Sequence, residues 1–312
     1  MPKLFQMKRS HLLLVIILFL ISSKTYSQTV DALFVSAFTK YQSNDFAGAV
    51  SDYTQVIALK ADYADAYFNR AISYEKLNQD QNAIADYTKV LSLNPKDINA
   101  LLNRGLVYAR MEKDKSALLD FDAALAVKPD FATAFYQRGL IYQREGLDSL
   151  ALKDFGKFIA TYPTNIAGRM ALASLYDQME EYDMAIKIYT AVISLDSTQA
   201  KAYFNRAFDY DLISQPDRAM QDYTKAIHFD ANYADAYYNR AFIHNEMNEF
   251  DAAIADYTVV ITLQPQSSDA YFNRGIAKLN AGRKHESCED ISKAAALGDK
   301  AAKKYYQTNC EK

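Results

Sequence analysis

The chain has 312 residues, half of them hydrophobic, with only nine Gly and six Pro. This composition excludes a disordered chain and long flexible linkers. The formal net charge of −3, without a basic run, also excludes a surface that binds nucleic acid or anionic membranes through their phosphate groups.

The first predicted element is a signal peptide over residues 1–27. Lys3, Lys8 and Arg9 precede an unbroken apolar run from Leu12 to Ile21. This run is about half of the ~20 residues that a membrane-spanning helix needs, so cleavage is favoured over retention as an anchor. No Cys lies near the cleavage site, so lipid attachment has no acceptor. Removing these residues takes away four positive charges and changes the formal charge from −3 to −7. We therefore expect an exported, non-lipidated protein that is not inserted in a membrane after cleavage.

From Val30 to Ala301 the sequence repeats every 34 residues without insertion or deletion, which makes eight units. A motif of the form Tyr-Phe-Asn-Arg-Ala/Gly begins, with substitutions, at Tyr67, Leu101, Phe135, Tyr203, Tyr237 and Tyr271. Within a unit, small or apolar residues at positions 4, 8 and 11, and again at 20, 24 and 27, have the spacing of one helix face. Each unit is therefore predicted to be a pair of helices.

The residue types at these positions explain how the two helices would pack. Position 8 is always Ala or Gly and position 20 is Ala in all units but the last, so the helix axes can approach closely. Position 24 is Tyr or Phe in seven units and would fill the adjoining space. Pro at position 32 of four units would end the second helix.

This pattern resembles the tetratricopeptide repeat. The resemblance implies an all-α fold, an α-solenoid in which eight helix-turn-helix repeats form a right-handed superhelix whose first helices line a concave groove. The repeat array would occupy residues 28–302, and a C-terminal capping helix would end within 303–312.

Paired charges link positions 7 and 23 of the repeat. Six units have Arg at the first position and Asp at the second; among them are Arg70 with Asp86, Arg104 with Asp120, and Arg240 with Asp256. We predict structural ion pairs that join the two helices of a unit or adjacent units. The alternative, an anion-binding ladder of arginines, is disfavoured because the matched aspartates would neutralise it.

The resemblance places positions 2, 5, 6, 9, 12 and 13 on the concave groove. Positions 5 and 9 form an apolar, largely aromatic ribbon that includes Phe68, Tyr136, Phe204, Phe208, Tyr238, Phe242 and Phe272. The ribbon either packs between neighbouring first helices or forms a contact surface for a partner. Position 6 carries Asn69, Asn205, Asn239 and Asn273, which either contact a partner's backbone or are structural amides. The lysines with which some relatives clamp a C-terminal carboxylate are missing from position 5.

The fifth unit, residues 166–199, departs most from the pattern. It lacks both members of the charge pair, and Gly168, Arg169 and Ser174 interrupt the usual residue types. The departure would mark either a bend or recognition break, or sequence drift, which we favour.

Chemistry beyond binding finds little support in the sequence. The four histidines do not cluster, and there is no phosphate-binding loop, nucleophile elbow or metal-spaced Cys/His set, so neither an enzyme nor a metal or other cofactor is predicted. Cys288 and Cys310, in an exported protein, are predicted to form a disulfide rather than a redox or metal site. The family likeness implies that this bond closes the array.

The sequence therefore predicts a non-enzymatic scaffold that binds a protein or peptide, located in the periplasm of a bacterial envelope or secreted. The alternative is a carrier that uses the aromatic groove to hold a small apolar ligand or a glycan.

Overall fold

The structure is a computed structural model that describes residues 29–311. The predicted signal peptide lies outside these residues. The described chain consists of helices joined by short turns, without a strand. None of its helices is long and apolar enough to cross a membrane. It divides after Gly146 into two compact units, each of which is described by itself.

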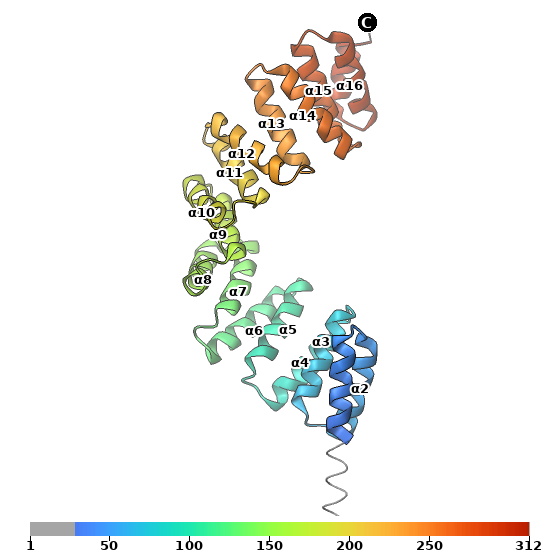
Figure 1. The fold of residues 1–312 in the computed structure, drawn as a ribbon, viewed down its shortest axis with the longest axis vertical. Coiled ribbons are helices and arrows are strands. Elements are labelled where there is room, and N and C mark those ends of the chain that lie inside the picture. The colour runs from blue at the N-terminus through green and yellow to red at the C-terminus, as the bar shows by residue number, and fades with distance from the viewer. Residues whose placement is uncertain (1–28, 312) are drawn as a thin grey trace, which may run out of the picture. The chain divides into compact units, whose positions relative to one another are not determined.

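The N-terminal unit begins with a helix over residues 29–42. It continues with α2 (Phe46–Leu59), α3 (Ala64–Lys76), α4 (Asp80–Leu93), α5 (Ile98–Arg110), α6 (Asp114–Val127) and α7 (Ala132–Arg144) (Figure 1).

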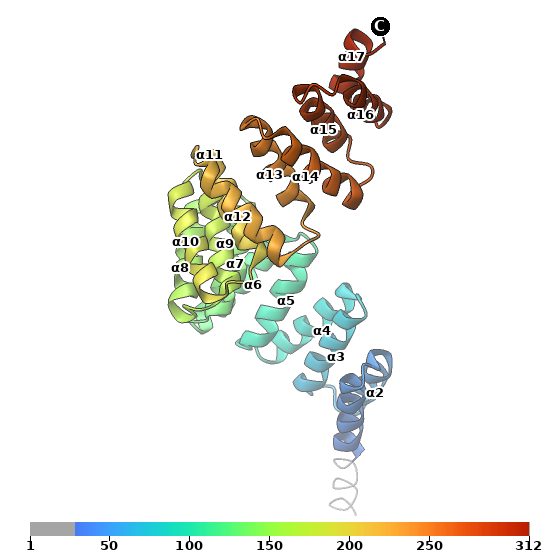
Figure 2. The same ribbon diagram turned by 45° about the horizontal axis from the view of Figure 1, so that its top comes forward.

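The C-terminal unit has α8 (Asp148–Thr161), α9 (Ile166–Gln178), α10 (Tyr182–Leu195), α11 (Ala200–Leu212), α12 (Pro216–Phe229), α13 (Ala234–Glu246), α14 (Phe250–Leu263), α15 (Ser268–Asn280), α16 (Lys284–Ala296) and α17 (Lys300–Asn309). In this unit each helix from α13 to α16 packs against the next one along the chain (Figure 2).

Each repeat has the predicted two helices, and a residue with positive φ ends the first of them. This residue stands at position 15 of every repeat. It is Asn44, Asn78, Glu112, Gly146, Glu180, Ser214, Asn248 or Gly282. Gly or Asn, the residue types that adopt the left-handed conformation most readily, stand here in five repeats. Glu112, Glu180 and Ser214 adopt it in the other three, where the residue type alone does not account for the turn.

The small residues at position 8 make room for the ring at position 24. A Cβ added to Gly105 would lie 2.6 Å from a ring carbon of Phe121, and one added to Gly275 would lie 2.8 Å from Ile291. The rings of Tyr53, Tyr87, Phe121 and Tyr223 are fully buried. Close packing of a large side chain on a small one thus forms the core inside each repeat.

The arginine at position 7 joins three helices. In the second repeat, Arg70 donates from Nε and Nη2 to the two carboxylate oxygens of Asp86, both at 2.7 Å, and from Nη1 to the hydroxyl of Thr54 at 2.9 Å. Asp86 lies on the second helix of the same repeat, whereas Thr54 lies on that of the preceding repeat. The same three-way contact recurs around Arg104, Arg206, Arg240 and Arg274.

The fifth repeat, which lacks this arginine, has local substitutes. Gly168 leaves room for Phe158 of α8, since an added Cβ would lie 2.4 Å from that ring. The guanidinium of Arg169 donates from Nε to the carbonyl oxygen of Pro163 at 2.8 Å. Both unusual residues therefore serve the packing of α9 on the segment before it.

The C-terminal cap is α17, which packs on α16. Cys288 of α16 and Cys310, which follows α17, form a disulfide with a Cα–Cα distance of 5.7 Å. The chain is an all-α solenoid of helix-pair repeats, as predicted, while the handedness of a complete superhelix stays a prediction.

Candidate functional site

The aromatic ribbon of the first helices separates into buried and exposed rings. Position 5 is half-buried: Phe68 lies edge-on to Tyr87 at 5.6 Å between centroids, and Phe204 stacks on Tyr233 at 4.7 Å. Tyr238 lies edge-on to Tyr257, with 5.5 Å between the ring centroids. These rings contribute mainly to packing within and between repeats.

Position 9 behaves differently. Phe208 and Phe242 are each 45% exposed and Phe38 is 44% exposed. Phe208 and Phe242 occupy equivalent positions of consecutive repeats, on α11 and α13. Two large rings, open to solvent and one repeat apart, form the apolar part of the candidate binding surface.

The position 6 asparagines use their amide donors inside the protein. The Nδ2 atom of Asn205 donates to the hydroxyl of Tyr189 at 2.9 Å, and that of Asn239 donates to the hydroxyl of Tyr223 at 3.2 Å. Asn69 donates at 2.7 Å to the carbonyl oxygen of Asp65, in its own helix. Asn273 donates to the hydroxyl of Tyr238 at 2.6 Å. Of the two readings of these asparagines, the donor contacts favour the structural amide.

The remaining predicted groove residues, Tyr136 and Phe272, are half-buried. Burial raises the pKa of the Tyr136 hydroxyl. Phe272 packs with the buried cluster around Ile291 beneath the C-terminal cap. Both rings therefore lie in the same kind of environment as the other rings at position 5.

In the N-terminal unit, the first helices line a depression of about 320 Å³. Its walls are Tyr41, Ile72, Glu75, Lys76, Asn103 and Arg110. Arg110 Nη2 lies 3.2 Å from a Glu75 carboxylate oxygen and 2.7 Å from one of Asp80, and Tyr87 donates its hydroxyl proton to Glu75 at 2.6 Å. Glu75 and Arg110, two of the three charged residues of this depression, are thus paired within the protein.

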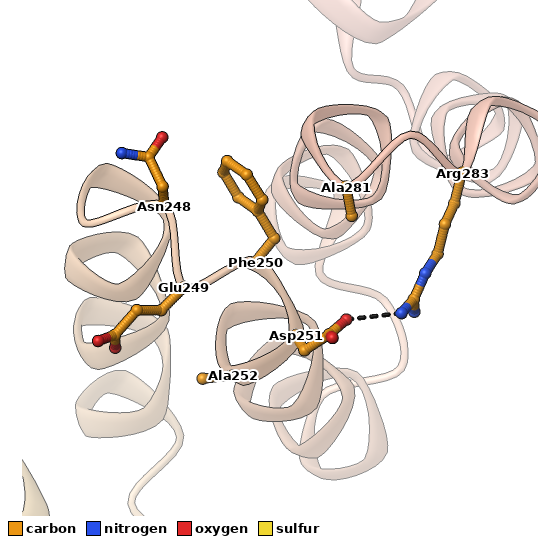
Figure 3. Close-up of a pocket in the computed structure, with 7 residues that line it drawn as sticks. All are labelled: Asn248, Glu249, Phe250, Asp251, Ala252, Ala281 and Arg283. Carbon is orange, nitrogen blue, oxygen red and sulfur yellow. Dashed lines mark hydrogen bonds and ion pairs between the residues drawn. The ribbon is translucent and has the colours of Figure 1, made fainter.

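A second kind of depression lies at the turns rather than along the first helices. Figure 3 shows it between the turn after α13 and the turn after α15, with a volume of about 410 Å³, where Asp251 and Arg283 form an ion pair at 2.6 Å. A similar depression of about 470 Å³ occurs 34 residues earlier, over Ser214 to Arg218. Because it recurs with the repeat, we attribute it to the stacking of turns rather than to a site built for a ligand.

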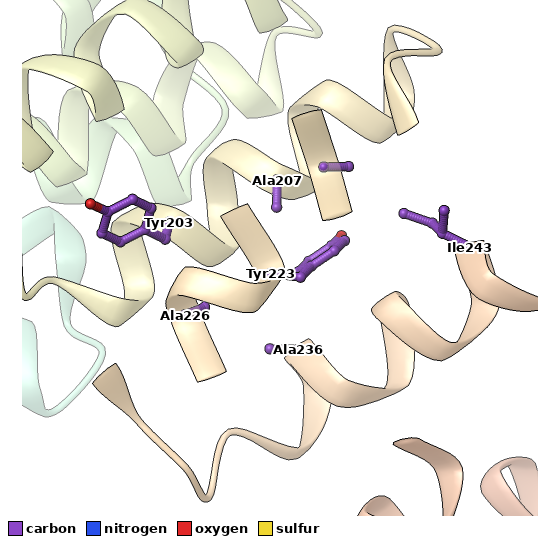
Figure 4. Close-up of a cluster of buried hydrophobic side chains, with 7 residues drawn as sticks. Tyr203, Ala207, Tyr223, Ala226, Ala236 and Ile243 are labelled. Carbon is purple, nitrogen blue, oxygen red and sulfur yellow. The ribbon is translucent and has the colours of Figure 1, made fainter. Parts of the chain in front are cut away.

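Position 10 contains the residue that sequence reasoning missed. From the third repeat onward this position is otherwise buried and apolar, as in Ile141, Leu175 and Ile243. Figure 4 shows Ile243 directed towards Tyr223 of the preceding repeat, in the buried cluster that also contains Ala207. In the sixth repeat the residue at position 10 is Asp209, which is only 1% exposed. Asp209 is the single ionisable residue at position 10 of the eight repeats, and this was visible in the sequence.

Asp209 faces a second carboxyl group. Burial, and then the proximity of Asp177 on α9, raises the pKa of Asp209 to about 8. Burial also raises the pKa of Asp177. The Oδ2 atom of Asp177 accepts a hydrogen bond from the hydroxyl of Tyr189 at 2.5 Å. Each aspartate has one buried oxygen without a donor in the described structure. The two side chains therefore share a proton at neutral pH, because adjacent buried carboxyl groups cannot both ionise.

Side chains that could ligate a metal lie apart in the described part of the chain. Among residues 29–311, no group of three or more His, Cys, Asp or Glu side chains is placed to hold a metal ion. His244 contacts Glu249 at 2.6 Å, and His285 lies on the exposed surface of α16.

The stacked helix pairs and the exposed rings of their first helices define a helical-repeat protein of the scaffold type. Models of the tetratricopeptide repeat match residues 39–78, 64–97, 133–165, 168–199 and 234–267. The chain belongs to the tetratricopeptide repeat family.

Solved structures agree with this assignment. The C-terminal part of a repeat protein from Cytophaga hutchinsonii is 21% identical, with a TM-score of 0.67, and the match covers 77% of this chain and 98% of that one. MamA is 27% identical with a TM-score of 0.51, covering 55% of this chain and 94% of that one. YrrB, described as having an unusual peptide-binding site, is 24% identical with a TM-score of 0.52, covering 59% and 95%. A search of curated proteins found no match.

Proposed function

We propose that this protein is a non-enzymatic scaffold that binds a protein or peptide on the surface formed by its first helices. The observation that carries the proposal is the pair of exposed rings, Phe208 and Phe242, at equivalent positions of consecutive repeats. A periodic surface of this kind suits an extended or helical segment, which can place one side chain on each ring. YrrB shows that a chain of this fold can hold a peptide.

The test is a selection of random displayed peptides on the full chain. Peptides that are enriched should lose binding to the variant Phe208→Ser/Phe242→Ser, because polar side chains remove both apolar contacts. Leu119→Ser is the matched control. Leu119 is 70% exposed and lies on α6, which is the second helix of the third repeat and so does not belong to the surface of first helices. Helix content, measured by circular dichroism, should be unchanged in both variants. Enrichment of no peptide, or equal binding to the ring variant, would reject the proposal.

The alternative is a carrier for a small apolar ligand or a glycan. The same protein should then bind such a molecule saturably while no displayed peptide is retained. The exposed rings would take part in either case. The failure of the peptide selection, combined with saturable binding of a small molecule, therefore distinguishes the two functions.

We also propose that the protein is exported and works in the periplasm or outside the cell. Two features support this proposal: the signal-like sequence of residues 1–27 and the disulfide between Cys288 and Cys310. N-terminal sequencing of the protein from its native host should give Gln28 as the first residue. An intact N-terminus in the cytoplasm would contradict export.

A further inference from the structure

We propose that the first-helix surface of the C-terminal unit takes a cationic peptide, whose lysine or arginine side chains meet the carboxylates around Asp177 and Asp211 while its apolar side chains cover Phe208 and Phe242. This inference rests on the proposed function and names the chemistry of the partner.

The first argument is the balance of charge on this surface. Positions 2, 5, 6, 9, 12 and 13 lie three or four residues apart and share one face of a helix. On α9, α11, α13 and α15 these positions carry five acidic residues and one basic residue, Lys201. The acidic residues are Asp177, Asp211, Asp235, Glu246 and Asp269. Within residues 29–311, no lysine, arginine or histidine forms an ion pair with any of the five.

The N-terminal unit provides the contrast within the same chain. The equivalent positions there carry three acidic and three basic residues. Its arginines are occupied, since Arg110 contacts Glu75 and Asp80, and Arg144 contacts Asp114. The excess of negative charge is therefore specific to the C-terminal unit, where it surrounds exposed rings. Such a surface favours a partner of opposite charge and raises its rate of association.

The second argument is the carboxyl pair at the joint between α9 and α11. Asp209 takes a place that is apolar in neighbouring repeats, and its unpartnered oxygen is buried. The titratable groups that interact with it are Asp177 of α9, Tyr189 of α10 and Tyr223 of α12. No cation in the described chain is among the groups that shift its pKa. In the free protein, the proton shared by Asp177 and Asp209 is the only positive charge at this carboxyl pair in the described chain.

A peptide cation beside Asp177 would supply the missing positive charge. Asp177 is only half-buried, so a side chain lying on the surface can approach it. Phe208 and Asp211, three residues apart, share one face of α11, and Asp211 stands at the position of its repeat that is equivalent to Asp177. A cation in this place stabilises both carboxylates in ionised form, so the shared proton leaves for solvent as the peptide binds. Binding should therefore strengthen as the pH rises towards about 8, where the free pair loses its proton.

The experiment compares three acetylated and amidated peptides that share one Leu and Ser framework and carry Lys, Gln or Glu at the remaining positions. Binding to the full chain is measured by isothermal titration calorimetry at several pH values. We expect the order Lys, then Gln, then Glu. Between about pH 6 and about pH 8 the affinity for the Lys peptide should rise several-fold, while that for the Gln peptide stays constant, since only the cation displaces a proton.

Two variants locate the effect. Asp177→Asn/Asp211→Asn should lower the affinity for the Lys peptide about tenfold, as expected for the loss of two partly exposed ion pairs. Asp209→Ile, which copies the residue of the next repeat, should abolish the pH dependence between about 6 and 8. The control Glu289→Gln removes one charge from the surface of α16, where Glu289 is 65% exposed, and should leave the affinity unchanged.

The outcomes separate this inference from the proposed function. If displayed peptides bind through Phe208 and Phe242 but the Lys peptide binds no better than the Gln peptide, the charge preference is wrong and the scaffold proposal stands. If none of the three peptides binds while displayed peptides do, the conclusion is the same. If no displayed peptide binds at all, both proposals fail.

Discussion

Replacing Asp209 by Ile should stabilise the protein, and by more as the pH rises. The wild-type side chain is 1% exposed and leaves one oxygen without a donor. An unsatisfied buried polar group costs about 1–3 kcal/mol, and the apolar replacement adds a buried side chain worth about 1.5–3 kcal/mol. Allowing for imperfect packing, we expect a gain of ~2–4 kcal/mol at about pH 7.

The pH dependence follows from the sign of the pKa shift. Folding raises the pKa of Asp209 from 3.8 to about 8. Between these values the folded protein keeps a proton that the unfolded chain has released, so unfolding releases a proton and stability falls as the pH rises. The slope is up to ~1.4 kcal/mol per pH unit, shared with Asp177 because the two groups titrate as a pair. The Ile variant lacks most of this dependence, so its advantage should be smallest at about pH 4 and largest at about pH 8.

Urea unfolding followed by far-UV circular dichroism at several pH values is the appropriate assay. Individual repeats can unfold separately, so the transition that reports the C-terminal unit must be followed. Ile243→Asp is the matched reverse exchange, one repeat further along, and should destabilise by about 3 kcal/mol or more. An Asp209→Ile protein no more stable than wild type at about pH 8, or equally stabilised at about pH 4 and about pH 8, would refute the shared proton.

Two further predictions concern the contacts that hold the array together. Arg240→Met should destabilise the protein by ~3–5 kcal/mol, because it leaves Asp256 buried without its partner. The double variant Arg240→Met/Asp256→Leu should recover most of that loss, as measured by chemical denaturation. Equal losses in the single and double variants would contradict this prediction. Reduction of the disulfide between Cys288 and Cys310 should lower the free energy of unfolding by about 3 kcal/mol. The amides of α17 should then exchange with solvent before those of the rest of the C-terminal unit. Unchanged protection of α17 would show that the disulfide does not hold the cap.

The sequence predicts the repeated parts of this protein well. Because each position recurs in eight units, the register of the helix pairs, the small residues beneath the ring and the pairing of Arg70 with Asp86 follow from comparison of the repeats. The third partner of Arg70, Thr54, was also visible, since Thr recurs at the same position of several units. It was missed because its contact crosses from one repeat to the next.

The candidate binding surface was harder to predict, because the exposure of a ring depends on its neighbours rather than on its residue type. Phe204 and Phe208 are both phenylalanines on one helix, yet Phe204 stacks on Tyr233 while Phe208 is 45% exposed. Helix periodicity places both on the same side and cannot show which of them a neighbour covers. The division between packing and contact therefore needed the structure.

The unusual fifth repeat and Asp209 of the sixth repeat meet at one joint of the solenoid, where Asp177 of α9 faces Asp209 of α11. Drift alone would explain a weakened joint, and the Ile variant would then be more stable with no other change. If the carboxyl pair serves binding, Asp209→Ile should gain stability and also lose the pH dependence of its affinity for the peptide. Natural binding sites often retain such destabilising groups because ligand contacts require them. Measuring stability and peptide affinity on one variant therefore decides whether this joint is a relic of drift or part of the binding surface.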